Sequence, residues 1–307
     1  MSGYVTLAPA KVNLGLFVGP TREADGRHEL VTVMQSISLA DELRLESAGA
    51  GAERDELVCA GLAGPPEENL AARALAAFRA ATGWDAPPLK LTVDKRIPVA
   101  AGLGGGSADA AAALRLARHA SGLGDEALLL ELAAGLGADV PAQVKPGRWL
   151  ARGAGELLEA LPDPLPALEL LVLPSHAELS TAAVYREADE LGLEREQGEL
   201  EHLRSQLRIA LELGAPLPPE RELLHNDLEQ AAVSLCPPIA QTLAAVGETG
   251  AERALVSGSG PTVLGLFGHA NASGRVRRAA AELAELEPAP LPASSVVASF
   301  AAVTELP

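Results

Sequence analysis

The stretch Lys95-Arg-Ile-Pro-Val-Ala-Ala-Gly-Leu-Gly-Gly-Gly-Ser-Ala-Asp-Ala110 decides the fold of this chain. Residues 89–94, just before it, alternate apolar and polar side chains, which predicts a half-buried strand. Ser107 predicts the N-cap of an alanine-rich helix over residues 108–119. Between them stand four glycines that permit positive φ and let a ligand approach the bare backbone: Gly102, Gly104, Gly105 and Gly106.

This order of strand, glycine loop and capped helix is typical of a phosphate site. It directs several backbone N–H groups and the positive end of a helix dipole to one point. The loop is not a Walker A motif, because no Gly-Lys-Ser/Thr follows it, and its glycines lack the spacing of the dinucleotide fingerprint. Taken alone, the glycine cluster fits a flexible turn before a helix equally well. The choice between a phosphate site and a simple turn therefore depends on the rest of the chain.

Length, composition and charge narrow the class of protein. The chain has 307 residues, 48% of them hydrophobic and 21% charged, which predicts a soluble globular protein of two domains. Its formal net charge of −17 disfavours nucleic acid and anionic membranes as partners. Cys59 and Cys236 are too few for a disulfide framework, and no apolar run reaches spanning length, so we expect a cytoplasmic protein.

Polar residues near the N-terminus are candidates for a site. Residues 9–18 predict a strand on which Lys11 and Asn13 share one face. An exposed strand lysine is the competing interpretation of Lys11. His28 lies in a turn-like run, where it is either a ligand contact or a surface histidine. Residues 30–39 and 41–45 predict two further strands around a short polar break.

Two more candidates flank predicted helices. Asn69 precedes helical periodicity over residues 69–81 and has the place of an N-cap. Asp139 follows a predicted helix over residues 125–136 and precedes a proline, where its side chain either projects into a cleft or caps a turn.

The second half of the chain predicts a separate domain. Prolines in residues 161–166 indicate a junction, which divides the chain into domains 1–161 and 162–307. We expect a strand over residues 168–173 and a helix with a hydroxyl cap from residue 180. Residues 254–267 predict two strands around a glycine turn, and residues 295–303 predict a closing strand, which can pack back on the N-terminal domain.

Three separated motifs together resemble the GHMP kinases, a superfamily of small-molecule kinases. They are Pro9-Ala-Lys-Val-Asn-Leu14, Pro98-Val-Ala-Ala-Gly-Leu-Gly-Gly-Gly-Ser-Ala108 and Ser257-Gly-Ser-Gly-Pro-Thr262. Each is of moderate specificity, but all three occur in order across nearly the whole chain. Within the superfamily the chain most resembles the diphosphocytidyl-methylerythritol kinases of non-mevalonate isoprenoid synthesis. The stretches that carry this are Ala24-Asp-Gly-Arg-His-Glu-Leu30, Leu136-Gly-Ala-Asp-Val-Pro141, Ala151-Arg-Gly-Ala-Gly-Glu156 and Leu224-His-Asn-Asp-Leu-Glu229.

The resemblance implies a fold and a reaction. The fold is α+β with two domains, an N-terminal ribosomal-S5-domain-2-like α/β domain and a C-terminal ferredoxin-like α+β domain, with the active site in the cleft between them. ATP would be the phosphoryl donor, Mg²⁺ the metal, and a hydroxyl of a small cytidylyl sugar alcohol the acceptor. We expect a monomer or weak homodimer with neither nucleic acid nor membrane as partner.

The same resemblance implies roles for particular residues. Asp139 would be the base, with Lys11 beside it favouring the developing alkoxide. Ser107 would reach the magnesium ion. The substrate would be held by Asn13, Arg27, His28, Thr181 and Tyr185. ATP would be held by Asn69, Pro98, Val99, Ala100, Ala101, Gly102, Leu103, Gly104, Gly105, Gly106, Ser107 and Ala108.

Arg27 is a departure from the family pattern. The usual run is Asp-Gly-Tyr-His, whose tyrosine stacks on cytosine, and here Arg27 has that place. A guanidinium can also stack on a base, so the clamp either persists as Arg27 against Tyr185 across about 7 Å, or is weaker, or accepts a different head group.

Three other functions stay open from the sequence. The chain could be another GHMP enzyme, such as a mevalonate-pathway or homoserine kinase. It could be a non-catalytic nucleotide-binding protein of this fold, although both Lys11 and Asp139 are present. An RNA-binding protein is disfavoured by the acidic balance and by the lack of a basic patch.

Overall fold

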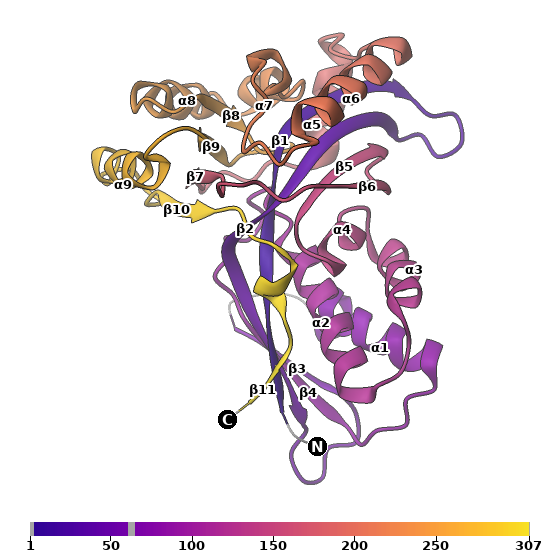
Figure 1. The fold of residues 1–307 in the computed structure, drawn as a ribbon. Coiled ribbons are helices and arrows are strands. Elements are labelled where there is room, and N and C mark those ends of the chain that lie inside the picture. Colours follow the sequence, from indigo (N-terminus) through magenta and orange to yellow (C-terminus); the bar gives the residue numbers. More distant parts are fainter. Residues whose placement is uncertain (1–2, 61–64, 307) are drawn as a thin grey trace.

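The computed structural model contains two β-sheets with helices packed against them (Figure 1). The structure describes residues 3–60 and 65–306. The α+β class with two sheets is confirmed. No helix in these ranges is both long and apolar enough to cross a membrane.

The first sheet is organised around two long antiparallel strands, β1 (Tyr4–Thr21) and β2 (His28–Ser47). The strand order is β11-β1-β2-β4-β3, and β5 and β6 continue the sheet from the N-terminal half of β2. The other strands are β3 (Glu56–Cys59), β4 (Leu89–Asp94), β5 (Arg148–Gly153), β6 (Leu157–Leu161) and β11 (Thr304–Glu305). Among the strand pairs in the described part of this sheet, only β3–β4 is parallel.

The polar break predicted in β2 does not exist. Asp41, at the expected break, is fully buried. Its carboxylate accepts hydrogen bonds from the backbone N–H groups of Arg96 and Ile97 and from Lys95 Nζ. Because this buried charge is satisfied, β2 continues through it as one strand. Pro9 lies in the middle of β1 at a shift in register, where its missing N–H does no harm.

Four helices cover one face of the first sheet: α1 (Leu70–Thr82), α2 (Gly105–Ser121), α3 (Glu126–Leu136) and α4 (Val140–Val144). Alanine allows the central helix α2 to approach the sheet closely, and Ala110, Ala111 and Ala112 are all fully buried. The predicted N-cap of α1 is confirmed, since Asn69 Oδ1 accepts from Ala71 N at 2.9 Å.

The second sheet has the order β10-β7-β9-β8 and is antiparallel throughout. Its strands are β7 (Glu169–Leu173), β8 (Arg253–Val256), β9 (Val263–Phe267) and β10 (Leu291–Ser294). The helices of this half are α5 (Thr181–Glu190), α6 (Gln197–Leu211), α7 (Glu229–Leu235), α8 (Pro238–Glu248) and α9 (Ala272–Glu282). Short 3₁₀ helices span Pro66–Glu68, Arg221–Leu223 and Ala298–Ala301.

One hydrophobic cluster joins the two sheets. It brings Val12 and Leu14 of β1 together with Leu170 and Val172 of β7 and with Leu264 of β9. In the chain, β6 of the first sheet is followed by β7 of the second, while the division at residues 161 and 162 stays a prediction. β11 returns to pair with β1.

Two predictions of local structure are wrong. Residues 295–303 are not a strand, because the chain crosses there from one sheet to the other. In that crossing Val296 N donates to Ser36 O, and Thr6 Oγ1 donates to Ala301 O. Ser180 stands at the N-cap position of α5, but its hydroxyl makes no capping hydrogen bond.

Candidate active site

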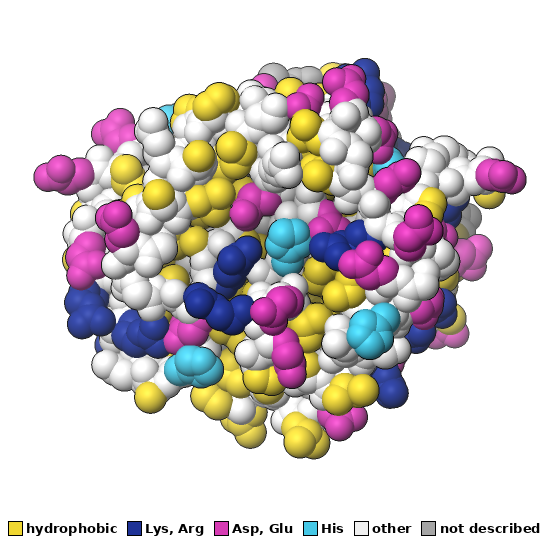
Figure 2. All heavy atoms as spheres, turned by 90° about the horizontal axis from the view of Figure 1, so that it is seen from above, with side chains coloured by type: hydrophobic (Ala, Val, Ile, Leu, Met, Phe, Trp, Pro, Cys, Tyr) yellow, Lys and Arg dark blue, Asp and Glu magenta, His cyan; other side chains and the backbone are white. Residues whose placement is uncertain are grey.

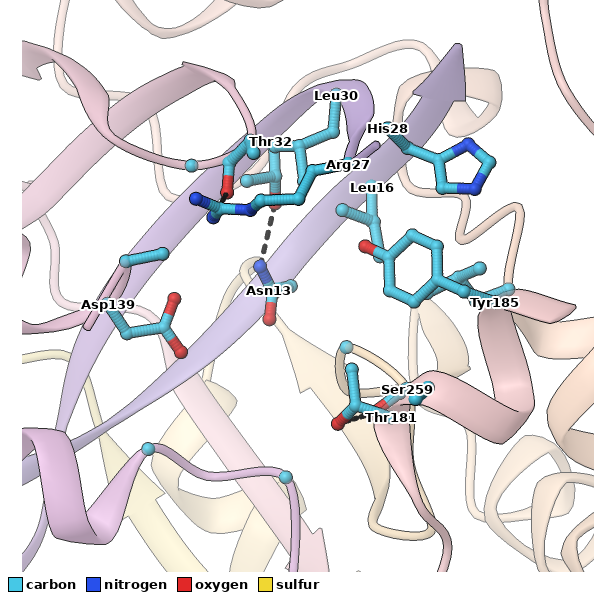
Figure 3. A pocket seen from close by; sticks show the side chains of 18 of the residues that line it. Asn13, Leu16, Arg27, His28, Leu30, Thr32, Asp139, Thr181, Tyr185 and Ser259 are labelled. Carbon is cyan, nitrogen blue, oxygen red and sulfur yellow. Dashed lines mark hydrogen bonds between the residues drawn. The ribbon is translucent and has the colours of Figure 1, made fainter. Parts of the chain in front are cut away.

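A cavity of about 720 Å³ lies where the two halves of the molecule meet. Its walls come from β1, β2, the glycine loop, α5 and the turn between β8 and β9. Figure 3 shows Asn13, Asp139 and Tyr185 directed into it from different elements. Ten residues predicted for the site line this cavity: Lys11, Asn13, Arg27, His28, Gly102, Gly104, Ser107, Asp139, Thr181 and Tyr185.

Lys11 and Asp139 form an ion pair in the wall of the cavity. Lys11 Nζ is 3.3 Å from Asp139 Oδ2 and donates to Asn13 Oδ1 at 2.9 Å. Lys11 is only 8% exposed, so the interpretation as a solvated strand lysine is wrong. Asp139 occupies the N-cap position of α4 without a capping hydrogen bond, which leaves its carboxylate free to face the cavity.

The orientation of Asn13 is fixed by a chain of hydrogen bonds across the sheet. Its Nδ2 donates to Thr32 Oγ1 at 2.8 Å, and that hydroxyl donates to Gly15 O at 2.6 Å. Since Nδ2 is used in this way, Oδ1 is left to accept from Lys11. The asparagine therefore positions the ammonium beside Asp139.

The glycine loop differs in detail from its prediction. Gly102 and Gly104 have φ of 72° and 68°, whereas Gly105 and Gly106 already belong to the first turn of α2. Gly104 is the N-cap, so Ser107 lies inside the helix and does not cap it. The four-glycine run therefore supplies both the loop and a bare first helical turn.

A second cavity, of about 310 Å³, continues from the loop. Gly102, Gly104 and Ser107 line both cavities, so the two meet at the N-terminus of α2. The remaining predicted nucleotide residues that line it are Asn69, Pro98, Val99, Ala100, Ala101, Leu103, Gly105 and Gly106. Ala108 lines neither cavity, because it is buried against the helices.

The sequence did not reveal a buried charge cluster beneath the loop. Lys95 Nζ lies 2.5 Å from Asp41 Oδ2 and 2.8 Å from Asp109 Oδ2. Burial raises the pKa of Asp109 to about 7, although Lys95 opposes the shift. Lys95 and Asp109 both line the second cavity. The only signal was the quoted motif itself, since Lys95 and Asp109 lie within it but Asp41 is remote.

The third motif locks the glycine loop from the other half of the molecule. Thr262 Oγ1 donates to Ala101 O at 2.6 Å, and a Cβ at Gly102 would lie 2.6 Å from Gly260 O. Buried Asn226 holds this motif in turn, because its Nδ2 donates to Val256 O at 2.8 Å and to Gly258 O at 2.7 Å. The third motif therefore packs directly against the glycine loop. Its residues Gly258 and Ser259 also line the site, although neither was predicted to.

The far end of the cavity is aromatic. The rings of His28 and Tyr185 stack with centroids 5.2 Å apart and planes at 27°. His28 Nδ1 lies 3.1 Å from Gly19 O, and Nε2 lies 3.2 Å from Asp189 Oδ1. Burial raises the pKa of Tyr185 to about 12, so its phenol stays protonated. Asp189 was not predicted, and nothing in its sequence context indicated it.

Arg27 and Thr181 lie on opposite walls of this end (Figure 3). Arg27 Nη2 donates to Ala154 O at 3.0 Å, and Thr181 Oγ1 lies 3.0 Å from Ser259 Oγ. The side chain stacked on Tyr185 is His28 rather than Arg27, and the clamp between Arg27 and Tyr185 stays a prediction.

The sequence is similar to known kinases over most of its length. The model of the GHMP kinases N terminal domain matches residues 69–147, and that of the GHMP kinases C terminal domain matches residues 201–286. A 4-diphosphocytidyl-2-C-methyl-D-erythritol kinase of Anaeromyxobacter dehalogenans (strain 2CP-C) is 43% identical over 270 residues, covering 86% of this chain and 80% of that protein.

Solved structures show the same likeness. The crystal structure of a 4-(cytidine 5'-diphospho)-2C-methyl-D-erythritol kinase superposes with a TM-score of 0.74 at 33% identity, covering 94% of this chain and 98% of that one. A homoserine kinase from Cytophaga hutchinsonii superposes with a TM-score of 0.73, covering 99% and 98%, but at 16% identity it shares the fold alone.

Proposed function

This chain belongs to the GHMP kinases and, within them, to the 4-diphosphocytidyl-2-C-methyl-D-erythritol kinases, and we propose that it catalyses their reaction with the Lys11–Asp139 pair. It is an ATP-dependent small-molecule kinase that serves isoprenoid precursor synthesis. The acceptor is a hydroxyl of 4-diphosphocytidyl-2-C-methyl-D-erythritol. The observation that carries the proposal is the ion pair at 3.3 Å, which lies between a phosphate loop and an aromatic pocket.

The donor phosphates lie at the N-terminus of α2. Phosphoryl transfer depends on positioning and on neutralising phosphate charge. The free N–H groups of the first helical turn and the helix dipole supply both. Gly105 and Gly106 leave that turn without side chains, which supports close approach of the phosphates. Asn69 and the loop residues 98–107 line the space for the rest of the nucleotide.

Asp139 takes the proton of the acceptor hydroxyl as the phosphoryl group is transferred. Its carboxylate faces the cavity and makes no capping hydrogen bond, so it is available to the substrate. The Lys11 ammonium, fixed by Asn13, stabilises the negative charge that develops on the attacking oxygen.

A magnesium ion fits this site as a companion of ATP. Among the described residues no group of three or more His, Cys, Asp or Glu side chains is placed to hold a metal, which suits an ion held largely by phosphates and water. Ser107, which lines both cavities, and Asp139, which lines the larger one, would offer oxygen ligands to the ion. The ion would neutralise phosphate charge.

The aromatic end holds the cytidylyl group. Tyr185 and His28 offer ring faces, and Arg27 a guanidinium plane, for contact with a base. Asn13 and Thr181 line the wall between this end and the reacting centre. A cavity of about 720 Å³ suits a ligand that joins a nucleotide to a sugar alcohol.

The remaining parts of the proposal concern the setting of the enzyme. Cys59 and Cys236 are free thiols, which supports a cytoplasmic location. We propose a monomer or weak homodimer with domains 1–161 and 162–307, and neither nucleic acid nor membrane as partner.

A substrate panel tests this function. ATP turnover is measured with 4-diphosphocytidyl-2-C-methyl-D-erythritol, mevalonate and homoserine as acceptors at equal concentration. We expect turnover with the cytidylyl substrate and background rates with the other two. Preference for mevalonate or homoserine would reassign the substrate, and no turnover with any acceptor would favour a non-catalytic nucleotide-binding protein.

A further inference from the structure

A third cavity, of about 630 Å³, lies at the C-terminal end of α2, at the other end of that helix from the glycine loop. Its walls are the last turns of α2, the start of α3, the end of α4 and residues 298–303. It shares no lining residue with the active-site cavities. The reaction described above makes no use of it.

Positive charge gathers in this cavity although the chain is strongly acidic. The cations Arg115, Arg118 and Lys145 line it, together with His119, and Glu126 is the one acidic residue among the lining residues. The formal net charge of the chain is −17. On the face shown in Figure 2, by contrast, basic side chains stand among acidic ones. Such a local reversal of sign attracts anions.

Arg115 is the least exposed of these cations, and no carboxylate of the residues that the structure describes pairs with it. Its Nη1 donates to Gln143 O at 2.6 Å and its Nη2 donates to Leu7 O at 2.8 Å. Its Nε is buried and finds no acceptor in the described part of the chain. Burial lowers the pKa of Arg115 to about 10, with no acid to oppose the shift. A partly buried guanidinium held by carbonyl oxygens alone keeps its full positive charge, and a bound anion nearby would offset that charge.

Part of the lining of the cavity is aliphatic. Leu129, Val144, Ala298, Ala301 and Val303 line it. Leu129 and Val144 are buried, and both belong to the core beneath the helices. A ligand that fills this space therefore has a charged group for the arginines and a short apolar part for this wall.

We propose that this cavity is a binding site for a small organic diphosphate, an anion that carries a short aliphatic group. The diphosphate contacts Arg118 and Lys145, which are exposed at the mouth, and lies in the field of Arg115. The aliphatic group lies against Leu129, Val144 and the residues 298–303. Arginine suits such a ligand because its planar guanidinium can form paired hydrogen bonds with phosphate oxygens.

The same arginine connects this cavity to the catalytic pair. Arg115 bridges β1 to α4, through Leu7 four residues before Lys11 and Gln143 four residues after Asp139. Gln143 Nε2 also donates to Pro9 O at 3.0 Å. A ligand that draws on the charge of Arg115 thereby acts on both elements that carry the pair. We therefore expect occupancy of the cavity to change turnover. This consequence rests on the proposed function, whereas the anion site itself does not.

Calorimetry with defined probes tests the site. Butyl diphosphate and inorganic pyrophosphate are titrated into the full chain in the presence of a saturating non-hydrolysable ATP analogue, which occupies the phosphate loop. The test variant is Arg118→Ala/Lys145→Ala. The matched control is Arg277→Ala/Arg278→Ala, which removes two exposed cations from α9 in the other half of the molecule.

We expect one butyl diphosphate per chain in the wild type and in the control. Binding should be at least about tenfold weaker in the test variant, since each hydrogen bond to a charged group contributes about 1.5 kcal/mol or more. No binding to the wild type, or equal affinity in the test variant, would overturn the site. Pyrophosphate should bind more weakly than butyl diphosphate, and equal affinities would refute the role of the aliphatic wall.

Turnover measurements separate this inference from the proposed function. Butyl diphosphate should alter kcat in the wild type and the control at saturating substrates, and should leave the test variant unaffected. Unchanged kcat with binding intact would refute the coupling through Arg115. A complete lack of turnover would refute the proposed function, while calorimetry would still decide the anion site.

Discussion

Replacing Gly104 with alanine tests whether the loop positions the catalytic lysine. Gly104 has φ of 68°, and an added Cβ would lie 2.9 Å from Lys11 Cγ and 3.2 Å from Lys11 Cε. To relieve these contacts, the Lys11 side chain has to shift by about half an ångström. In the wild type its Nζ lies 3.3 Å from Asp139 Oδ2, so the shift would disturb this ion pair. Alanine in the left-handed region also costs roughly 1 kcal/mol.

The expected result is a large loss of activity with a small loss of stability. Misplacing a catalytic group by about 1 Å can cost about 100-fold in rate, so we expect kcat of Gly104→Ala to fall about 10- to 100-fold. The backbone strain alone should lower Tm by about 2 °C. Steady-state kinetics with both substrates varied, together with thermal unfolding, measure these two effects separately.

Gly83→Ala is the matched control. Gly83 has φ of 66°, close to that of Gly104, but an added Cβ there meets nothing within 4 Å. It ends α1, away from the residues that line the active-site cavity. Both variants should lose about the same stability, and Gly83→Ala should keep its turnover. If kcat of folded Gly104→Ala stays within about twofold of that of Gly83→Ala, the loop does not position Lys11.

Two further variants probe the base pocket and the buried cluster. Arg27→Ala should raise KM for the cytidylyl substrate about 2- to 30-fold and leave KM for ATP unchanged. Arg27→Tyr should restore the KM for the cytidylyl substrate. Unaltered substrate kinetics in Arg27→Ala would exclude the clamp. Burial raises the pKa of Asp109 from 3.8 to about 7. Between these pH values, Asp109 is protonated in the folded protein and ionised in the unfolded chain. The stability of wild type relative to Asp109→Asn should therefore fall from about pH 4 to about pH 7, and denaturant unfolding showing a rise would contradict this.

Local signals predicted the elements that surround the loop. The strand over residues 89–94 and the N-cap at Asn69 follow from alternation and capping, and both are found. The full length of β2 could not be predicted from the sequence. A charged residue such as Asp41 indicates an interruption of a buried strand unless its hydrogen-bond partners are known. Those partners, Lys95, Arg96 and Ile97, lie 54 to 56 residues further along the chain, and no pattern in a single sequence joins them to Asp41.

The prediction that Lys11 lies beside Asp139 came from the resemblance to the family and not from the spacing of the two residues. They are remote in sequence, and each taken alone fits a solvated lysine or a capping aspartate. The prediction that Ser107 caps the helix was wrong, because Gly104 adopts the left-handed conformation and begins the helix three residues earlier. Asp189 was missed because its contact with His28 depends on the packing of α5 against β2.

In the proposed mechanism Asp139, held beside Lys11, takes the acceptor proton. The most direct test compares Asp139→Asn with wild type in single-turnover phosphorylation of 4-diphosphocytidyl-2-C-methyl-D-erythritol, with ATP affinity measured on the same samples. Loss of the general base should lower the rate about 100- to 10,000-fold and leave ATP binding intact. A folded Asp139→Asn enzyme that binds ATP and transfers phosphate at a near-normal rate would contradict the claim.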